Sequence, residues 1–114
     1  MQIKMTVRLL DENGEKAFGT GVALLLRRIE STGSLNQAAK SMEIAYSKAW
    51  KILHNAETLL GITFVEKSIG GAHGGGSRLT DEGRAFLEKY EVFSQEANRR
   101  TEDLFRQMFP EALD

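Results

Sequence analysis

The sequence has 114 residues, no cysteine, two histidines and a formal net charge of −1, which is the size of one ordinary domain. Its 41% hydrophobic and 27% charged residues are typical of a globular protein and exclude a disordered one. The lack of cysteine excludes disulfides, thiolate zinc sites and cysteine nucleophiles. The apolar runs are too short to cross a membrane and the first residues show no signal-peptide pattern, so we expect a cytoplasmic protein.

The charges are distributed unevenly along the chain. Residues 27–84 carry eight basic and six acidic side chains, whereas residues 85–114 carry four basic and seven acidic ones. The middle of the chain therefore permits a basic face, and the remainder is slightly acidic.

The first residues predict a β-hairpin. Residues 3–9 alternate apolar and polar side chains, which is typical of a half-buried strand. Asn13-Gly14 is a strong hairpin turn signal, and residues 16–18 can return as a second short strand. The hairpin is expected to occupy residues 1–19.

Two helices are predicted next. Apolar residues recur at helical spacing over residues 20–32, and Gly33 is placed to end that helix. Ser34 is a good N-cap for a second, short helix. Ala38 and Ala39 lie on its inner side, where their small side chains would allow a close crossing with the next helix.

A third helix is predicted over residues 45–60, ending at Gly61. Its apolar face is expected to include Trp50 and Leu53, so we expect Trp50 to pack in the core. His54 is expected at the helix surface or at an interface.

A glycine-rich hairpin and a long helix complete the pattern. Short β-prone runs at residues 63–67 and 77–79 flank the glycine-rich residues 70–76. Thr80 is placed to cap a final helix that is ended by Pro110. That helix carries a long apolar stripe at helical spacing.

The element order β-β-α-α-α-β-β-α is that of a winged helix-turn-helix. The expected fold class is α+β and mainly α, with an N-terminal β-hairpin and a long C-terminal dimerisation helix. We expect one domain over residues 1–114, divided into the hairpin (1–19), the winged helix-turn-helix (20–79) and the long helix (80–109).

The third helix and the glycine-rich hairpin are the candidate DNA-binding elements. Exposed polar and basic side chains near the N-terminus of a recognition helix meet base edges and phosphates, and glycines let a wing approach the backbone. The expected DNA-binding residues are Ser34, Asn36, Tyr46, Ser47, Lys48, Lys51, His73, Gly74, Gly75 and Arg78.

The last helix is too long for a domain of this size to cover, so we expect it to pair with a second copy of itself. Phe86 would anchor this helix to the body. The expected dimer-interface residues are Tyr90, Phe93, Ala97, Leu104 and Met108.

The sequence does not predict an enzyme. The glycine-rich loop lacks both the Gly-Lys-[Ser/Thr] ending of a P-loop and the G-x-G-x-x-G spacing of a dinucleotide fingerprint. Neither His54 nor His73 lies in a catalytic context, and no metal site or cofactor is expected. Two other hypotheses are a winged-helix protein-interaction module that has lost DNA binding, and binding of molybdate or another oxyanion by the glycine amides of the wing.

Several motifs together resemble a known family. They are Gly33-Ser34-Leu35-Asn36-Gln37-Ala38-Ala39-Lys40, Ala45-Tyr46-Ser47-Lys48-Ala49-Trp50, Leu60-Gly61, Val65-Glu66-Lys67, Gly70-Gly71 with Gly74-Gly75-Gly76, and Leu79-Thr80-Asp81-Glu82-Gly83. The chain resembles the N-terminal DNA-binding domain of the ModE family of molybdate-responsive regulators, which is related to the LysR-type winged helix. The resemblance spans roughly residues 3–109.

The resemblance implies a homodimeric, sequence-specific regulator of transcription that binds double-stranded DNA and is linked to molybdenum transport. Members with a C-terminal molybdate-binding region are longer, so the chain resembles a single-domain form, and molybdate binding by it is not expected. Glu43 stands where the family usually has Gly, and Ala45 stands where a Ser cap is common.

Overall fold

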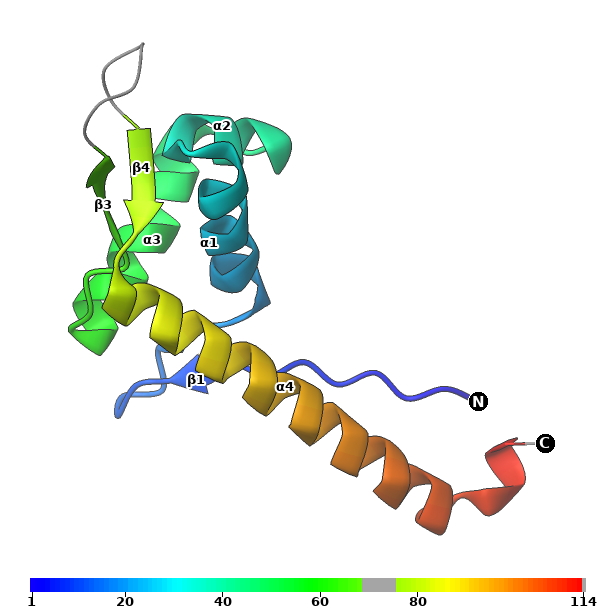
Figure 1. The fold of residues 1–114 in the computed structure, drawn as a ribbon. Helices are drawn as coiled ribbons and strands as arrows, with labels where there is room; N and C mark the ends of the chain where they lie inside the picture. Colours follow the sequence, from blue (N-terminus) through cyan, green and yellow to red (C-terminus); the bar gives the residue numbers. More distant parts are fainter. Residues whose placement is uncertain (69–75, 114) are drawn as a thin grey trace.

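The computed structural model describes residues 1–68 and 76–113 and has the predicted mainly helical α+β class (Figure 1). Its elements are β1 (Leu9–Leu10), β2 (Lys16–Phe18), α1 (Thr20–Thr32), α2 (Leu35–Ser41), α3 (Tyr46–Leu60), β3 (Val65–Ser68), β4 (Gly76–Leu79), α4 (Asp81–Met108) and the short 3₁₀ helix η1 (Pro110–Leu113). Each of the two antiparallel sheets has two strands, β1-β2 and β3-β4. None of the described helices is both long enough and apolar enough to span a membrane.

The ends of the helices follow the local signals in the sequence. Gly33 and Gly61 have φ angles of 77° and 67° and end α1 and α3 in the left-handed conformation that glycine adopts without strain. The Ser34 hydroxyl accepts the backbone N–H of Gln37 at 3.0 Å. The equivalent cap at α4 is the Thr80 hydroxyl. The predicted caps are therefore confirmed.

An aromatic cluster joins the hairpin to the long helix. Phe18 is fully buried, and its ring centroid lies 5.6 Å from that of Phe64, 5.0 Å from that of Phe86 and 4.8 Å from that of Tyr90. Such tilted and edge-to-face aromatic contacts stabilise a core beyond the burial of their area. The prediction that Phe86 anchors α4 to the body is confirmed.

The N-terminal strand predicted over residues 3–9 is wrong for all but its end, because β1 begins only at Leu9. The preceding residues run beside α4 instead of a second strand (Figure 1). The Val7 carbonyl accepts the Tyr90 hydroxyl at 2.7 Å, and the Met5 sulfur accepts the Thr101 hydroxyl at 3.3 Å. The alternation of exposed and half-buried residues is present, but a helix supplies the covering surface.

The 28-residue helix α4 is about 42 Å long at ~1.5 Å per residue and extends past the body of the domain (Figure 1). Ion pairs fix its first half to α1. Arg27 pairs with both Glu91 and Glu30, and Arg84 binds Glu30 at 3.1 Å. Two hydrogen bonds hold the pKa of Glu30 below its ordinary value, the larger effect coming from Arg84 and the smaller from Arg27.

Candidate nucleic-acid interface

The crossing of α2 and α3 is built from small side chains. Ala38, Ala39 and Ala49 are all buried there, as the sequence predicts for Ala38 and Ala39. The turn between the helices is closed by the Ile44 N–H, which donates to the Ala39 carbonyl at 3.1 Å. The helix-turn-helix is therefore held by backbone bonds and methyl-sized contacts.

The two departures from the family pattern lie in this turn. Glu43 has a φ of 57°, which costs a residue with a Cβ about 1–2 kcal/mol. Ala45 occupies the N-cap of α3 and makes no side-chain capping bond. The turn keeps the helix-turn-helix geometry at a local cost in stability.

Replacing Glu43 by glycine should therefore stabilise the domain. Relief of the left-handed strain exceeds the extra unfolded-state entropy of glycine, and we expect a net gain of ~0.5–1 kcal/mol, or about 2–8 °C in Tm. Thermal unfolding followed by circular dichroism measures this gain. Glu43→Ala is the matched control, since it removes the same side chain but retains the Cβ. An equal gain from both variants would show that the carboxylate, and not the backbone, causes the cost.

The first turns of α3 present the predicted polar residues to solvent. Tyr46, Ser47, Lys48 and Lys51 are all exposed. Neither lysine ammonium makes an ion pair with any residue in the described part of the chain. The carboxylate of α3, Glu57, instead accepts the Phe64 backbone N–H at 2.8 Å. This face of α3 therefore presents positive charge without internal compensation.

Trp50 also lies on the exposed face, so the expectation that it packs in the core is wrong. Its side chain is 44% exposed and stacks on His54, with ring centroids 3.8 Å apart and planes 16° apart. The buried face of α3 is formed by Ala49, Leu53 and Ala56. Their 4-3 spacing was the sequence signal that separates Trp50 from the core, because Trp50 lies at the edge of that stripe.

The other predicted DNA-contact residues differ in whether their side chains already have a partner within the chain. The Ser34 hydroxyl is engaged in capping α2, whereas Asn36 is exposed in the first turn of that helix. On β4, the Arg78 guanidinium pairs with Glu66 at 3.0 Å across the hairpin. The wing residues His73, Gly74 and Gly75 lie outside the described residues.

The base of the wing is tied to the helix-turn-helix. The Ser77 N–H donates to the Gly33 carbonyl at 2.7 Å, next to the cap of α2. A Cβ on Gly76 would lie 2.8 Å from the same carbonyl oxygen, so only glycine allows this approach. The start of α2 and the loop end of the β3-β4 hairpin therefore form one unit, and α3 packs against α2 within it.

The predicted dimer residues divide into buried and exposed ones. Tyr90 is only 5% exposed because its ring packs on Phe18 and its hydroxyl binds Val7, which leaves little surface for a partner. Phe93 is 56% exposed, and Leu104 and Met108 are exposed as well. Ala97 is half-buried.

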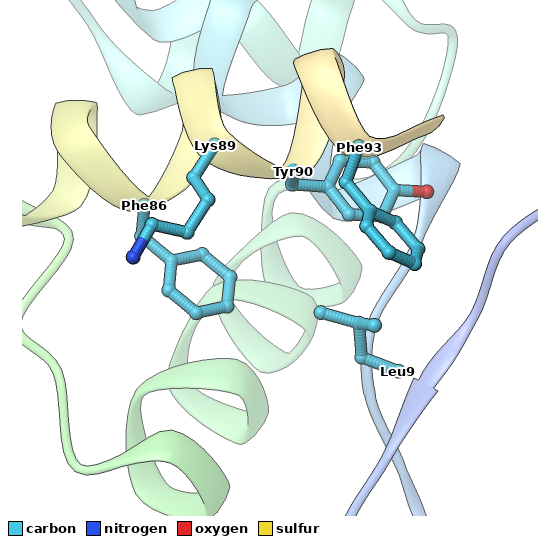
Figure 2. A pocket seen from close by; sticks show the side chains of 5 residues that line it. All are labelled: Leu9, Phe86, Lys89, Tyr90 and Phe93. Atoms are coloured by element: carbon cyan, nitrogen blue, oxygen red, sulfur yellow. The ribbon is translucent and has the colours of Figure 1, made fainter. Parts of the chain in front are cut away.

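An apolar hollow opens beside Phe93. It has a volume of about 200 Å³ and lies between α4 and the hairpin (Figure 2). Figure 2 shows the side chains of Phe86, Tyr90 and Phe93 extending from α4 toward Leu9, with Lys89 at the side. The hollow and the exposed Phe93 ring form one continuous apolar surface on the helix.

No cluster of three or more histidine, aspartate or glutamate side chains that could hold a metal ion occurs within residues 1–68 and 76–113. Within the same ranges, many carboxylates are engaged in arginine pairs on the helix surfaces, as Glu96 is with Arg99 and Arg100. These exposed pairs lower the pKa of Glu96 to about 2, chiefly through the Arg99 hydrogen bond.

Comparison with known proteins shows which regulators the chain is similar to. The chain is 35% identical over 71 residues to the DNA-binding transcriptional dual regulator ModE of Escherichia coli K12, covering 62% of this chain and 27% of that protein. It is 37% identical over 70 residues to the transcriptional regulator ModE of Yersinia pestis, covering 61% of this chain and 27% of that protein. The chain is a homologue of the ModE regulators.

A molybdenum transport protein ModE from Herbaspirillum seropedicae is 39% identical over 83 residues, or 73% of this chain and 30% of that protein. No family model matches the sequence. The resemblance drawn from the sequence motifs is confirmed by these ModE homologues. The chain spans less than a third of the length of each of these ModE proteins, so it corresponds to one part of them.

Proposed function

We propose that this protein is a sequence-specific, DNA-binding regulator of transcription that acts as a homodimer and controls genes linked to molybdenum transport. The observation that carries the proposal is the exposed, uncompensated basic face of α3, in a chain homologous to proteins named as transcriptional regulators. Molybdate itself is not expected to bind this chain.

The proposed binding mode places α3 in the major groove. Tyr46 and Ser47 begin the helix and are suited to contacting base edges, while Lys48 and Lys51 are suited to phosphates. Asn36 and the wing, with Arg78 at its base, would contact the adjacent backbone. Because Arg78 is paired with Glu66, its contribution requires exchange of the carboxylate for a phosphate.

The proposed dimer forms through α4. Phe93, Leu104 and Met108 are exposed along the helix, and the apolar hollow beside Phe93 is of the size to receive an apolar side chain. Two-fold pairing would bury this surface in both copies and would present two α3 helices to a palindromic site.

The decisive experiment is selection from the genome of the source organism. Purified protein is incubated with sheared genomic DNA at ~150 mM salt, and the retained fragments are sequenced. We expect an enriched palindrome near genes for molybdate uptake or use. A palindrome near other genes would support the regulator function and contradict the link to molybdenum transport. Retention of no DNA by the folded dimer would favour a protein-interaction module instead.

Lys51→Ala should weaken binding to all duplexes. Loss of one phosphate contact is expected to reduce the slope of log K against log salt by about 1 per bound subunit. Fluorescence anisotropy with the selected site and with random duplex measures both slopes. Lys4→Ala is the matched control, because it removes the same charge from the N-terminal segment. An unchanged slope for Lys51→Ala would remove this lysine from the interface.

A further inference from the structure

The exposed face of α3 holds an aromatic surface that the charge argument does not use. Tyr46, Trp50 and His54 are spaced four residues apart, so they lie on one side of the helix over about 12 Å at ~1.5 Å per residue. All three are exposed, with Tyr46 at 51% and Trp50 at 44%. This length matches the ~12 Å width of the major groove of B-DNA.

Contacts between Trp50 and His54 hold the indole in place. The His54 Nδ1–H donates to the Trp50 carbonyl oxygen at 3.2 Å, which sets the orientation of the imidazole. The imidazole then stacks on the indole at 3.8 Å between centroids. One face of the Trp50 ring is thereby covered within the helix, and the rest of the ring stays exposed and held in one orientation.

Stability of the domain does not require this arrangement. An i,i+4 side-chain pair stabilises a helix by only about 0.2–0.5 kcal/mol, and a charged pair would do so without exposing a large apolar ring. The core of α3 is completed by Ala49, Leu53 and Ala56 without the indole. A rigid, exposed indole on the same helix as the exposed Ser47 and Lys51 is the arrangement expected of a contact surface.

We propose that Trp50, held by His54, reads DNA bases by apolar contact in the major groove, with the thymine methyl group as its partner. The inference rests on the proposed function, because it uses the placement of α3 in the groove. Thymine is the base that presents a methyl group there, and apolar side chains recognise it by direct contact. The lysines would supply affinity for any duplex, and the indole would supply part of the sequence preference.

The test uses the intrinsic fluorescence of Trp50, which is the single tryptophan of the chain. Acrylamide quenching is measured with and without saturating duplex from the genomic selection, and dye anisotropy of the same samples reports binding. We expect the Stern–Volmer constant to fall several-fold on binding. The matched control is W50F/V92W, which moves the reporter to an exposed residue of α4 and should show no DNA-dependent change.

A thymine scan then tests base reading. Each thymine of the selected site is replaced in turn by deoxyuridine, which removes only the methyl group. We expect at least one position at which the wild type loses roughly fivefold or more in affinity and Trp50→Ala loses nothing further. Trp50→Ala itself should bind the selected site about tenfold more weakly and bind random duplex as the wild type does.

His54 is tested as a positioning residue. His54→Ala should weaken specific binding, because the indole loses its stacking partner, and His54→Phe should restore it by restoring the stack. Equal behaviour of these two variants would assign His54 no such role.

The outcomes separate the inference from the proposed function. Binding by anisotropy without protection of Trp50 overturns the inference and leaves the function intact. Protection without any methyl position coupled to Trp50 overturns base reading. No anisotropy change, with the selected site or with random duplex at low salt, overturns both.

Discussion

Replacing Gly83 by alanine is expected to destabilise the domain by ~2–4 kcal/mol, a large part of the ~5–15 kcal/mol that holds a typical domain folded. In a solvent-exposed helix the same change would stabilise by about 1 kcal/mol, because alanine has the higher helix propensity. The tertiary contacts of Gly83 reverse the sign of this change in stability. A Cβ on Gly83 would lie 2.6 Å from the carbonyl oxygen of Phe64 and 2.7 Å from the Cα of Phe64.

Phe64 is not free to move away. Its ring is fully buried in the aromatic cluster, its N–H is bound by Glu57, and its carbonyl accepts the Thr80 N–H at 2.9 Å. The Thr80 hydroxyl caps Gly83 and would lie 2.9 Å from the new Cβ. Relief of the clash therefore breaks the start of α4, including a cap whose loss alone costs ~0.5–2 kcal/mol.

Urea and thermal unfolding measure this effect, with Gly21→Ala in α1 as the matched control. A Cβ on Gly21 meets nothing within 4 Å, so that variant should gain up to about 1 kcal/mol. The two substitutions are chemically identical and are expected to have opposite signs. A Gly83→Ala protein at least as stable as the wild type would show that α4 is not packed closely on Phe64.

Phe93→Glu is expected to dissociate the proposed dimer. The Phe93 side chain is 56% exposed in the single chain, so the substitution should leave the fold and its Tm little changed. In a two-fold interface it would place two carboxylates in an apolar surface, and burial of an unpaired charge is costly. Sedimentation velocity should show a monomer at concentrations where the wild type is a dimer.

The affinity for a palindromic site should fall with the dimer. Two linked α3 helices bind with an avidity that exceeds either affinity by about 10²–10⁴-fold, and a monomer loses this gain. Val92→Glu is the matched control, because Val92 is 66% exposed on the neighbouring position but faces away from the apolar stripe. Dimerisation that survives Phe93→Glu, or is lost equally in Val92→Glu, would remove this face of α4 from the interface.

The sequence predicted the exposure of the candidate DNA-binding residues on α3 because this exposure depends on the local order of apolar and polar residues in one helix. The exposure of Tyr46, Ser47, Lys48 and Lys51 follows from their position at the start of a helix whose other side is apolar. The pairing of Arg78 with Glu66 was not foreseen, since cross-strand neighbours depend on the register of the hairpin.

Trp50 and Tyr90 show where sequence periodicity stops being informative. Helical spacing places both near an apolar stripe, but it does not say which neighbours cover the stripe. Tyr90 is buried because Phe18 and the N-terminal segment pack on it, while Trp50 is exposed because small alanines complete the core of α3. The sequence predicts the reverse, with Trp50 in the core of the domain and Tyr90 in a dimer interface.

The sequence by itself determined the order of the elements, the caps at Ser34 and Thr80 and the glycine ends of α1 and α3. Those features depend on hydrogen bonds and backbone angles within a few residues. Only the tertiary structure decided that residues before β1 pair with a helix, that Gly83 admits no side chain and that Trp50 faces outward. These features depend on contacts between residues distant in the chain, whose geometry the packing of the whole domain sets.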